Sequence, residues 1–267
     1  MQKVVLITGA SSGLGLATAL HLTKKGYIVF GTSRNPEKFT QSIPFELLPL
    51  EITDINSIET CVAEVIKRKK RVDVLINNAG VGITGPIEEL DIKAISSNFN
   101  TNCFGPLQMI KSVLPKMREQ SSGTIINITS IGGYMGLPFR GPYSASKSAL
   151  SIITESLSME VKNFGIKVVC LAPGDYATDI ASRRYYSPAL EKSPYKKYKE
   201  SLDTINKHVD QGNNPNEIAT AIDKILSKKN PRLHYEVGSF LQKLSKTLKK
   251  ILPSRIFEKI IMNHYNL

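Results

Sequence analysis

The segment GPYSASKSAL, residues 141–150, places a tyrosine and a lysine four positions apart, at Tyr143 and Lys147. If the segment is helical, both side chains lie on one face, so the ammonium can sit beside the phenol. A tyrosine hydroxyl, with a reference pKa of about 10, is a weak acid near neutral pH, but a neighbouring cation favours its ionised form. Such a phenol can give a proton to a carbonyl oxygen as hydride arrives, or take one from an alcohol in the reverse reaction.

Ser130 follows the apolar run GTIINIT, residues 123–129, and can supply a second hydrogen bond to the same substrate oxygen. Taken alone, a tyrosine and a lysine at this spacing are more often a half-buried tyrosine beside a solvated lysine. The catalytic interpretation therefore depends on what else the chain provides.

A glycine-rich turn, TGASSGLG at residues 8–15, lies between a β-like run and an expected helix. Gly9, Gly13 and Gly15 permit a tight turn, close approach of the backbone to an anion, and close packing of the helix. The start of that helix would add free N–H groups and a positive dipole for a pyrophosphate. A βα turn without a ligand fits such a segment equally well, but the absence of a lysine after Gly15 disfavours a nucleoside triphosphatase loop.

The second strand candidate ends in FGTSRNPEK, residues 30–38, where an acidic residue would bind the ribose 2'-hydroxyl of NAD. Ser33 and Arg34 stand there instead, and a guanidinium can pair with a phosphate through two charge-assisted hydrogen bonds. An exposed loop arginine is the plain alternative. After a glycine turn we favour recognition of a 2'-phosphate, which makes NADP(H) the expected cofactor.

Two asparagines end another apolar run, VDVLIN at residues 72–77, at the same expected edge of the sheet. Asn77 and Asn78 can serve as turn formers alone. Their position also suits contacts with the adenosine ribose or with neighbouring backbone, so this pattern by itself decides nothing.

Short β-branched runs alternate with longer helical patterns along the chain. The strand candidates are residues 3–8, 27–32, 45–51, 72–77, 123–129, 166–172 and, more weakly, 233–237. The helix candidates are residues 14–25, 55–69, 102–119, 143–163 and 215–228. Nearly continuous apolar strands between helices indicate a parallel sheet covered on both faces. We therefore expect a single α/β domain over residues 1–267, a doubly wound parallel sheet in three α/β/α layers.

Two stretches fall outside this alternation. Residues 175–212 follow the last strong strand and carry several Tyr, Arg and Lys residues, so we expect a substrate lid beyond the C-terminal edge of the sheet. Residues 239–267 form a C-terminal helical extension, in which residues 239–262 predict a basic amphipathic helix. That helix either packs on the domain or a partner subunit, which we favour, or makes peripheral contact with an anionic membrane.

Composition and charge exclude several classes of protein. The net charge of +12 divides into +9 for residues 183–267 and +3 for residues 1–182. The basic part carries no zinc-finger, RNP or basic-zipper pattern, so no nucleic-acid partner is expected. Three cysteines and four histidines are scattered without ligand spacing, so no metal site is expected. The sequence shows no transmembrane run and no secretory leader, which predicts a cytoplasmic protein.

Together these motifs occur in the order and spacing of the short-chain dehydrogenase/reductase family, which the chain resembles over about residues 2–180. The shared motifs are TGASSGLG at Thr8–Gly15, NNAG at Asn77–Gly80, Asn102 in NTNCFG, Ser130, YxxxK at Tyr143–Lys147 and PG at Pro173–Gly174. The segments GLPFRGPYSASKSAL and FGIKVVCLAPG are similar to its hydroxysteroid and keto-lipid branch. The resemblance implies a Rossmann fold, a nicotinamide cofactor and an Asn-Ser-Tyr-Lys catalytic centre.

On this resemblance, Tyr143 is the acid/base, Lys147 favours its ionised form and holds the nicotinamide ribose, and Ser130 positions the carbonyl. Asn102 would maintain the helix geometry and the water of a proton relay. The residues expected around the cofactor are Gly9, Ser11, Ser12, Gly13, Leu14, Gly15, Ser33, Arg34, Glu51, Ile52, Asn78, Ala79, Gly80, Tyr143, Lys147, Pro173, Gly174, Tyr176 and Thr178. Glu51 replaces the aspartate that is usual near the adenine. Tyr176 replaces a small aliphatic residue and would narrow the substrate mouth.

The expected activity is hydride transfer between NADP(H) and a carbonyl or secondary alcohol of a small, apolar molecule such as a steroid, a retinoid or a keto-lipid. Phe139, Tyr176 and the tyrosines that follow favour an apolar pocket. A catalytically silent NADP(H)-binding sensor or scaffold is the alternative, although a sensor could dispense with any of the four catalytic side chains. The resemblance also implies a homodimer or homotetramer.

Overall fold

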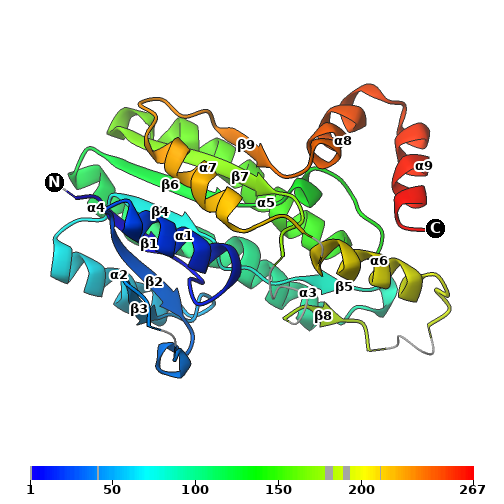
Figure 1. The fold of residues 1–267 in the computed structure, drawn as a ribbon, viewed down its shortest axis with the longest axis horizontal. Helices are drawn as coiled ribbons and strands as arrows, with labels where there is room; N and C mark the ends of the chain where they lie inside the picture. The colour runs from blue at the N-terminus through cyan, green and yellow to red at the C-terminus, as the bar shows by residue number, and fades with distance from the viewer. Residues whose placement is uncertain (1, 41, 178–182, 189–192, 211) are drawn as a thin grey trace.

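A parallel sheet runs through the centre of the protein (Figure 1). The computed structural model describes residues 2–40, 42–177, 183–188, 193–210 and 212–267. Within these residues, seven strands form one sheet in the order β3, β2, β1, β4, β6, β7, β9. They are β1 (Val4–Ile7), β2 (Ile28–Ser33), β3 (Glu46–Pro49), β4 (Val74–Asn77), β6 (Gly123–Ile128), β7 (Ile166–Pro173) and β9 (His234–Val237). The doubly wound α/β fold is therefore confirmed, including its weakest expected strand.

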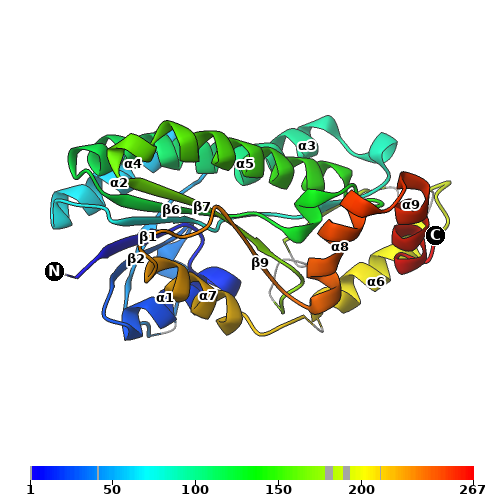
Figure 2. The same cartoon turned by 90° about the horizontal axis from the view of Figure 1, so that it is seen from above.

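Helices cover both faces of the sheet (Figure 2). One face carries α2 (Ile55–Lys69), α4 (Gly105–Glu119) and α5 (Gly141–Glu160), and the other carries α1 (Gly13–Lys24) and α7 (Asn216–Leu226). Leu6 joins the core under the first group, whereas its neighbours Val5 and Ile7 join the core under the second. Because both sides of the sheet are buried, the strands appear in the sequence as nearly continuous apolar runs.

The strand order reverses between β1 and β4, and this reversal positions the site. The chain proceeds from β1 to β2 and β3 in one direction, and from β4 to β6, β7 and β9 in the other. Connections on the two sides of such a reversal diverge and leave a crevice beyond the carboxyl ends of the strands. The glycine turn after β1 and the NNAG segment after β4 flank that crevice.

Several elements differ from the sequence-based expectation. We did not predict α3 (Ile92–Phe99), α6 (Tyr198–Asp210) within the lid segment, or the short parallel pair of β5 (Ile83–Thr84) with β8 (Tyr185–Tyr186). The helix expected from residue 102 instead begins with a π-helical turn, Asn100–Phe104, ahead of α4. A π turn inserts an extra residue into a helix, so it leaves the apolar periodicity on either side intact.

The C-terminal extension contains two helices, α8 (Phe240–Ile251) and α9 (Ser254–His264), so the single helix predicted over residues 239–262 was wrong. Pro253 explains the break, because proline cannot donate a helical N–H and keeps the preceding residue extended. Leu252 accordingly has ψ of 145°. Leu248 and Leu252 pack against a small core around Met135 and Phe257, so part of the apolar face of α8 covers the domain.

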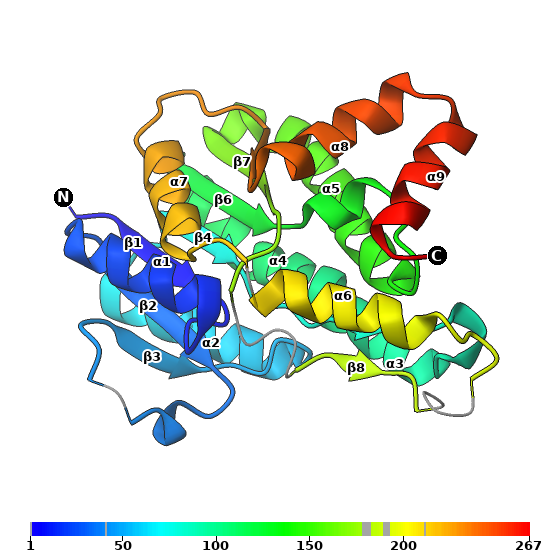
Figure 3. The ribbon, with the colours of Figure 1, turned by 45° about the vertical axis from the view of Figure 1, so that its right-hand side comes forward.

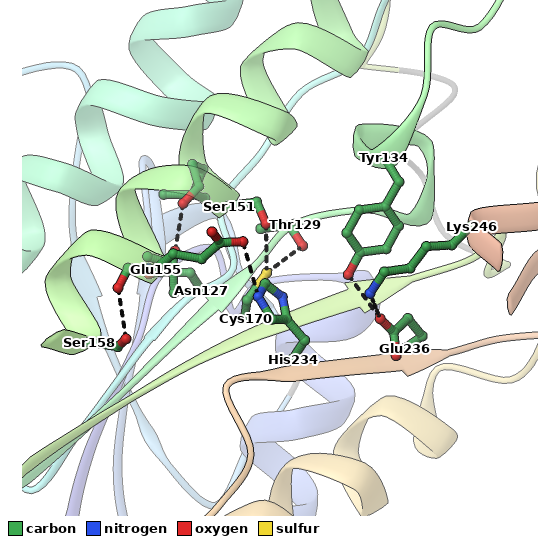
Figure 4. A network of polar contacts seen from close by, with 12 residues as sticks. Asn127, Thr129, Tyr134, Ser151, Glu155, Ser158, Cys170, His234, Glu236 and Lys246 are labelled. Atoms are coloured by element: carbon green, nitrogen blue, oxygen red, sulfur yellow. Dashed lines mark hydrogen bonds and ion pairs between the residues drawn. The ribbon is translucent and has the colours of Figure 1, made fainter. Parts of the chain in front are cut away.

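Polar contacts tie this extension to the sheet and to the loop after β6 (Figure 4). Glu236 on β9 pairs with Lys246 on α8 and accepts a hydrogen bond from the Tyr134 hydroxyl at 3.2 Å. Burial raises the pKa of Glu236, but the hydrogen bond from Lys246 leaves it below its ordinary value. Lys249 donates to the Tyr134 carbonyl at 2.7 Å. Tyr134 ends the turn that starts directly after Ser130, so the extension braces that loop.

Candidate active site

A cavity of about 540 Å³ opens in the crevice beyond the strand ends. The predicted residues that line it are Gly9, Ser11, Ser12, Gly13, Leu14, Ser33, Arg34, Glu51, Ile52, Asn78, Ala79, Gly80, Ser130, Tyr143, Lys147, Pro173, Gly174 and Tyr176. Gly15 and Asn102 are described but do not line the cavity, and Thr178 lies outside the described residues. The fold therefore gathers most of the predicted catalytic and cofactor positions around one space.

The glycine turn closes tightly over the start of α1. Gly9 has a φ of 69°, in the left-handed region that favours glycine. A Cβ added to Gly15 would lie 2.2 Å from the Gly9 carbonyl oxygen and 2.5 Å from Nδ2 of Asn78. The helix α1, which is described in full, carries no acidic residue in its first turn, and the Ser12 side chain does not cap it. Its first N–H groups therefore remain available to an anion in the cavity.

Asn78 joins the loops on the two sides of the crevice. Its Nδ2 donates to the carbonyl oxygens of Thr8 and Gly9, each at 3.0 Å. In return, the Thr8 hydroxyl accepts the backbone N–H groups of Asn78 and Ala79, each at 3.0 Å. The carboxamide thus holds the glycine turn in place, which matches the expectation of contacts with neighbouring backbone.

The outer end of the cavity is basic. Arg34 and Lys38 both line it, and both are exposed. Lys38 was not among the predicted site residues, although it stands in the same FGTSRNPEK segment. Glu51 also lines the cavity, and its carboxylate accepts hydrogen bonds from the backbone N–H of Thr53 at 3.1 Å and from the Thr53 hydroxyl at 2.9 Å. Because the Glu51 carboxylate is hydrogen-bonded to Thr53, Arg34 and Lys38 could bind a phosphate at this position.

Tyr143 and Lys147 lie one helical turn apart near the start of α5, with 7% and 5% of their surfaces exposed. The Lys147 ammonium donates to the Ile128 carbonyl oxygen, at the end of β6, at 3.0 Å. Burial lowers the pKa of Lys147, while the neighbouring Tyr143 acts in the opposite direction. A Cβ on Gly80 would lie 3.2 Å from this ammonium, so the loop after β4 passes directly over it.

Ser130 and Asn102 are fixed by different means. The Ser130 hydroxyl accepts the Gly132 N–H at 3.1 Å and keeps its own proton for a partner in the cavity. Asn102, buried in the π-helical turn, clamps Val81 by accepting its N–H and donating to its carbonyl, both at 2.9 Å. It also donates to the Ser146 hydroxyl at 3.2 Å. Asn102 therefore locks the loop after β4 onto α5 from behind the cavity wall.

The C-terminal extension contacts the part of the cavity wall that directly follows β7. Gln242 on α8 donates to the Asp175 carboxylate at 2.8 Å, and a Cβ on Gly174 would lie 2.0 Å from Oε1 of Gln242. Figure 3 shows α8 beside the end of β7. No local sequence signal identified this contact, because Gln242 and Gly174 lie far apart in the chain. A larger residue in place of Gly174 would therefore displace the Gln242 carboxamide from this position.

The catalytic end of the cavity carries positive charge that the site prediction did not include. Arg140, Arg183 and Arg184 line it together with Gly82 and Ile83. Of the aromatic residues expected to form an apolar pocket, Tyr176 lines the cavity and donates to Glu217 at 3.2 Å. Phe139 instead packs on Tyr198 of α6, with ring centroids 5.0 Å apart.

A parallel sheet with a glycine turn, and a tyrosine-lysine pair at its edge, define a nicotinamide-dependent oxidoreductase of the short-chain type. Residues 3–187 match the family described as short chain dehydrogenase, and the chain belongs to this family. It is 40% identical to the 3-ketodihydrosphingosine reductase of Bacteroides thetaiotaomicron over 98% of each chain, and 30% identical to human retinol dehydrogenase 8 over 93% of this chain and 85% of that one. A solved short-chain dehydrogenase from Streptomyces avermitilis superposes with a TM-score of 0.82, at 33% identity over 98% of each chain.

We predict that Gly15→Ala weakens NADPH binding by tenfold or more and lowers the free energy of unfolding by about 1–3 kcal/mol. The added Cβ would force the Gly9 carbonyl to move and open the turn. Fluorescence titration with NADPH and urea unfolding measure the two effects. Gly136→Ala is the matched control, because a Cβ at Gly136 meets no atom within 4 Å. Equal NADPH affinity of the two variants would contradict the assignment of this turn.

Proposed function

We propose that this oxidoreductase transfers hydride between NADP(H) and the carbonyl or secondary alcohol carbon of a small molecule with an apolar body. The observation that carries the proposal is the placement of Tyr143 and Lys147 on one face of α5, in the same cavity as Ser130 and the glycine turn. An anion cradle at one end and an acid/base pair at the other are what such a reaction requires.

The protein's own groups act on the substrate oxygen. The bound nicotinamide cofactor supplies or accepts the hydride. The Ser130 hydroxyl donates a hydrogen bond to the carbonyl oxygen, and the Tyr143 hydroxyl gives its proton to that oxygen in the direction of reduction. Lys147, held at 3.0 Å from the Ile128 carbonyl, places a cation beside the phenol and favours its ionised form as the proton leaves. Asn102 acts indirectly, since it positions the loop over Lys147.

Arg34 and Lys38 support NADP(H) over NAD(H). They stand where β2 ends, the place at which these folds recognise the ribose 2'-position. A 2'-phosphate would add charge-assisted hydrogen bonds to both cations, whereas a 2'-hydroxyl would leave them without an anionic partner.

Two relatives, named for 3-ketodihydrosphingosine and for retinol, support an apolar body in the substrate. We extend this proposal to a cytoplasmic homodimer or homotetramer.

Among the described residues, no helix has the length and apolarity needed to cross a membrane. Phe240, Leu241 and Ile251 on α8 are nevertheless more than 70% exposed, beside the exposed Lys243 and Lys250. This combination favours peripheral contact with an anionic membrane.

Tyr143→Phe should reduce turnover of a ketone panel by at least a thousandfold, because the proton donor is lost. NADPH affinity should change by less than about threefold, since the ring and its packing remain. NADPH oxidation and NADPH fluorescence measure these two quantities. Near-normal turnover by Tyr143→Phe would refute the mechanism. A wild-type protein that binds NADPH but reduces no carbonyl of the panel would instead indicate a silent sensor.

Arg34→Ser should lower the preference for NADPH over NADH by about tenfold to a hundredfold, the loss expected for a charge-assisted hydrogen bond. The preference is the ratio of kcat/KM for the two cofactors with one substrate. Arg118→Ser removes an equal charge from the exposed end of α4 and should leave the ratio unchanged. If both variants keep the wild-type ratio, Arg34 does not recognise the 2'-phosphate.

Vesicles of phosphatidylcholine containing phosphatidylglycerol should co-sediment with the wild-type protein, and added salt should weaken the binding. The double substitution Phe240→Asp and Leu241→Asp should reduce binding by about tenfold or more, because each inserted apolar side chain contributes roughly 1.5–3 kcal/mol. Met159→Asp, at another apolar residue that is 72% exposed, is the control. Absence of wild-type binding to these vesicles would remove the membrane proposal.

A further inference from the structure

Two arginines flank the tyrosine at the catalytic end of the cavity. Arg140 precedes α5, and its guanidinium carbon lies 4.9 Å from the centroid of the Tyr143 ring. Arg184 precedes β8 and is only 7% exposed, yet it also lines the cavity. A buried guanidinium is costly unless it has a partner, so each of these charges needs a physical explanation.

Backbone pairing holds Arg184 in its position. The N–H of Tyr185 donates to the Gly82 carbonyl oxygen at 3.0 Å, where β8 runs beside β5. A Cβ on Gly82 would lie 2.9 Å from Cγ of Arg184, so the arginine stem rests on the glycine. Its Nη1 donates to the Asn206 carboxamide of α6 at 2.8 Å. The guanidinium is therefore fixed at the cavity wall before any ligand arrives.

Neither arginine is neutralised within the described residues. No carboxylate of these residues lies within 4.0 Å of the Arg140 or Arg184 guanidinium. Burial lowers the pKa of Arg184, and the charge of Arg140 lowers it further. Asp175 is the nearby acid that acts on both arginines, but its carboxylate is already hydrogen-bonded to Gln242.

The second arginine remains cationic for a different reason. Burial acts to lower the pKa of Arg140, but Tyr265, Tyr143 and Asp175 together leave it above the ordinary value. Tyr265, near the C-terminal end, is 4% exposed, and the Ser201 hydroxyl donates to its carbonyl oxygen at 2.6 Å. Arg140 is thus kept charged by residues from the C-terminal extension and from the site itself.

We propose that Arg140 and Arg184 bind an anionic oxygen group on the carbonyl substrate, a carboxylate or a phosphate. This inference rests on the proposed reductase function and specifies its substrate class. The cofactor phosphates have their own donors at the start of α1 and at Arg34 and Lys38, at the other end of the cavity. An anion between the arginines would pair with one or both guanidinium groups and add the anionic partner that the described residues do not provide.

The position of the pair restricts the substrate further. Since Arg140 lies over the Tyr143 ring, the anionic group must be within a few bonds of the carbonyl that Tyr143 protonates. Arg140 and Arg184 disfavour a substrate with an ammonium group near its carbonyl, because positive charges would be brought together in a buried environment. A substrate with an apolar body and an anionic group beside the ketone, such as an oxo-acid, meets both conditions.

The test compares charged and neutral ketones of the same shape. One series contains linear oxo-carboxylates with the ketone two to five carbons from the carboxylate, each paired with its primary amide. A second series contains ketones that carry a phosphate monoester, each paired with the free alcohol. At least one charged member should show a kcat/KM that is about tenfold to a hundredfold higher than its neutral counterpart. The series that shows this preference identifies the source of the anion.

Arg184→Gln should reduce that charged-to-neutral ratio to less than about threefold, and Arg184→Lys should retain part of it. Arg255→Gln, which removes an equal charge from the exposed surface of α9, should leave the ratio unchanged. This control separates an effect of the Arg184 position from an effect of lower net charge. NADPH titration verifies that each variant is folded and retains its cofactor site.

Three results would overturn the inference. Equal kcat/KM for charged and neutral ketones in both series would show that no anion is recognised, although the reductase function would stand. A wild-type ratio retained by Arg184→Gln would show that this arginine is not the determinant. A loss of NADPH affinity in Arg184→Gln, with the ratio unchanged, would assign the arginine to the cofactor. Failure of the wild type to reduce any ketone would instead refute the proposed function on which the inference rests.

Discussion

The side chain of Lys147 is largely buried at the cavity wall, and a buried charge destabilises a fold unless it is hydrogen-bonded. Its bond to the Ile128 carbonyl therefore fixes α5 against the end of β6. Little space remains around it, because a Cβ on Gly80 would lie 3.2 Å from Nζ and a Cβ on Gly133 would lie 3.1 Å from Cβ of the lysine. The loops after β4 and β6 pass close to this side chain at glycines, and the position of Tyr143 follows from the helix that this lysine holds.

The sequence was informative wherever a local pattern determines a local structure. Buried parallel strands need continuous apolar runs, the glycine turn needs residues without a Cβ, and the YxxxK spacing aligns two side chains on any helix. The π-helical turn was not predictable in this way, since it leaves the apolar pattern of its flanking helices intact. Apolar periodicity also concealed the break at Pro253, although the proline itself indicated it. The meeting of Arg140 with Arg184 depends on the β5–β8 pairing, which two-residue strands do not reveal.

The C-terminal extension is part of the site rather than an appendage. It supports the loop after Ser130 through Tyr134, contacts the PG segment through Gln242, and brings Tyr265 near Arg140. These contacts come from different positions on α8 and α9, so the extension holds separate walls of the cavity in one arrangement. Its basic residues consequently have two uses: Lys246 and Lys249 bind the domain, while Lys243 and Lys250 face solvent.

The cavity draws its walls from both sides of the strand reversal, and this has a thermodynamic consequence. A ligand that fills it contacts loops that follow β1, β2 and β4 as well as β6 and β7, so it binds only when both halves of the sheet are assembled. Binding restricted to the native state adds RT ln(1 + [L]/Kd) to the free energy of unfolding, about 2.7 kcal/mol when the ligand is at one hundred times its Kd. The cofactor concentration in the surrounding solution therefore affects the folded fraction of this protein as well as its catalytic rate.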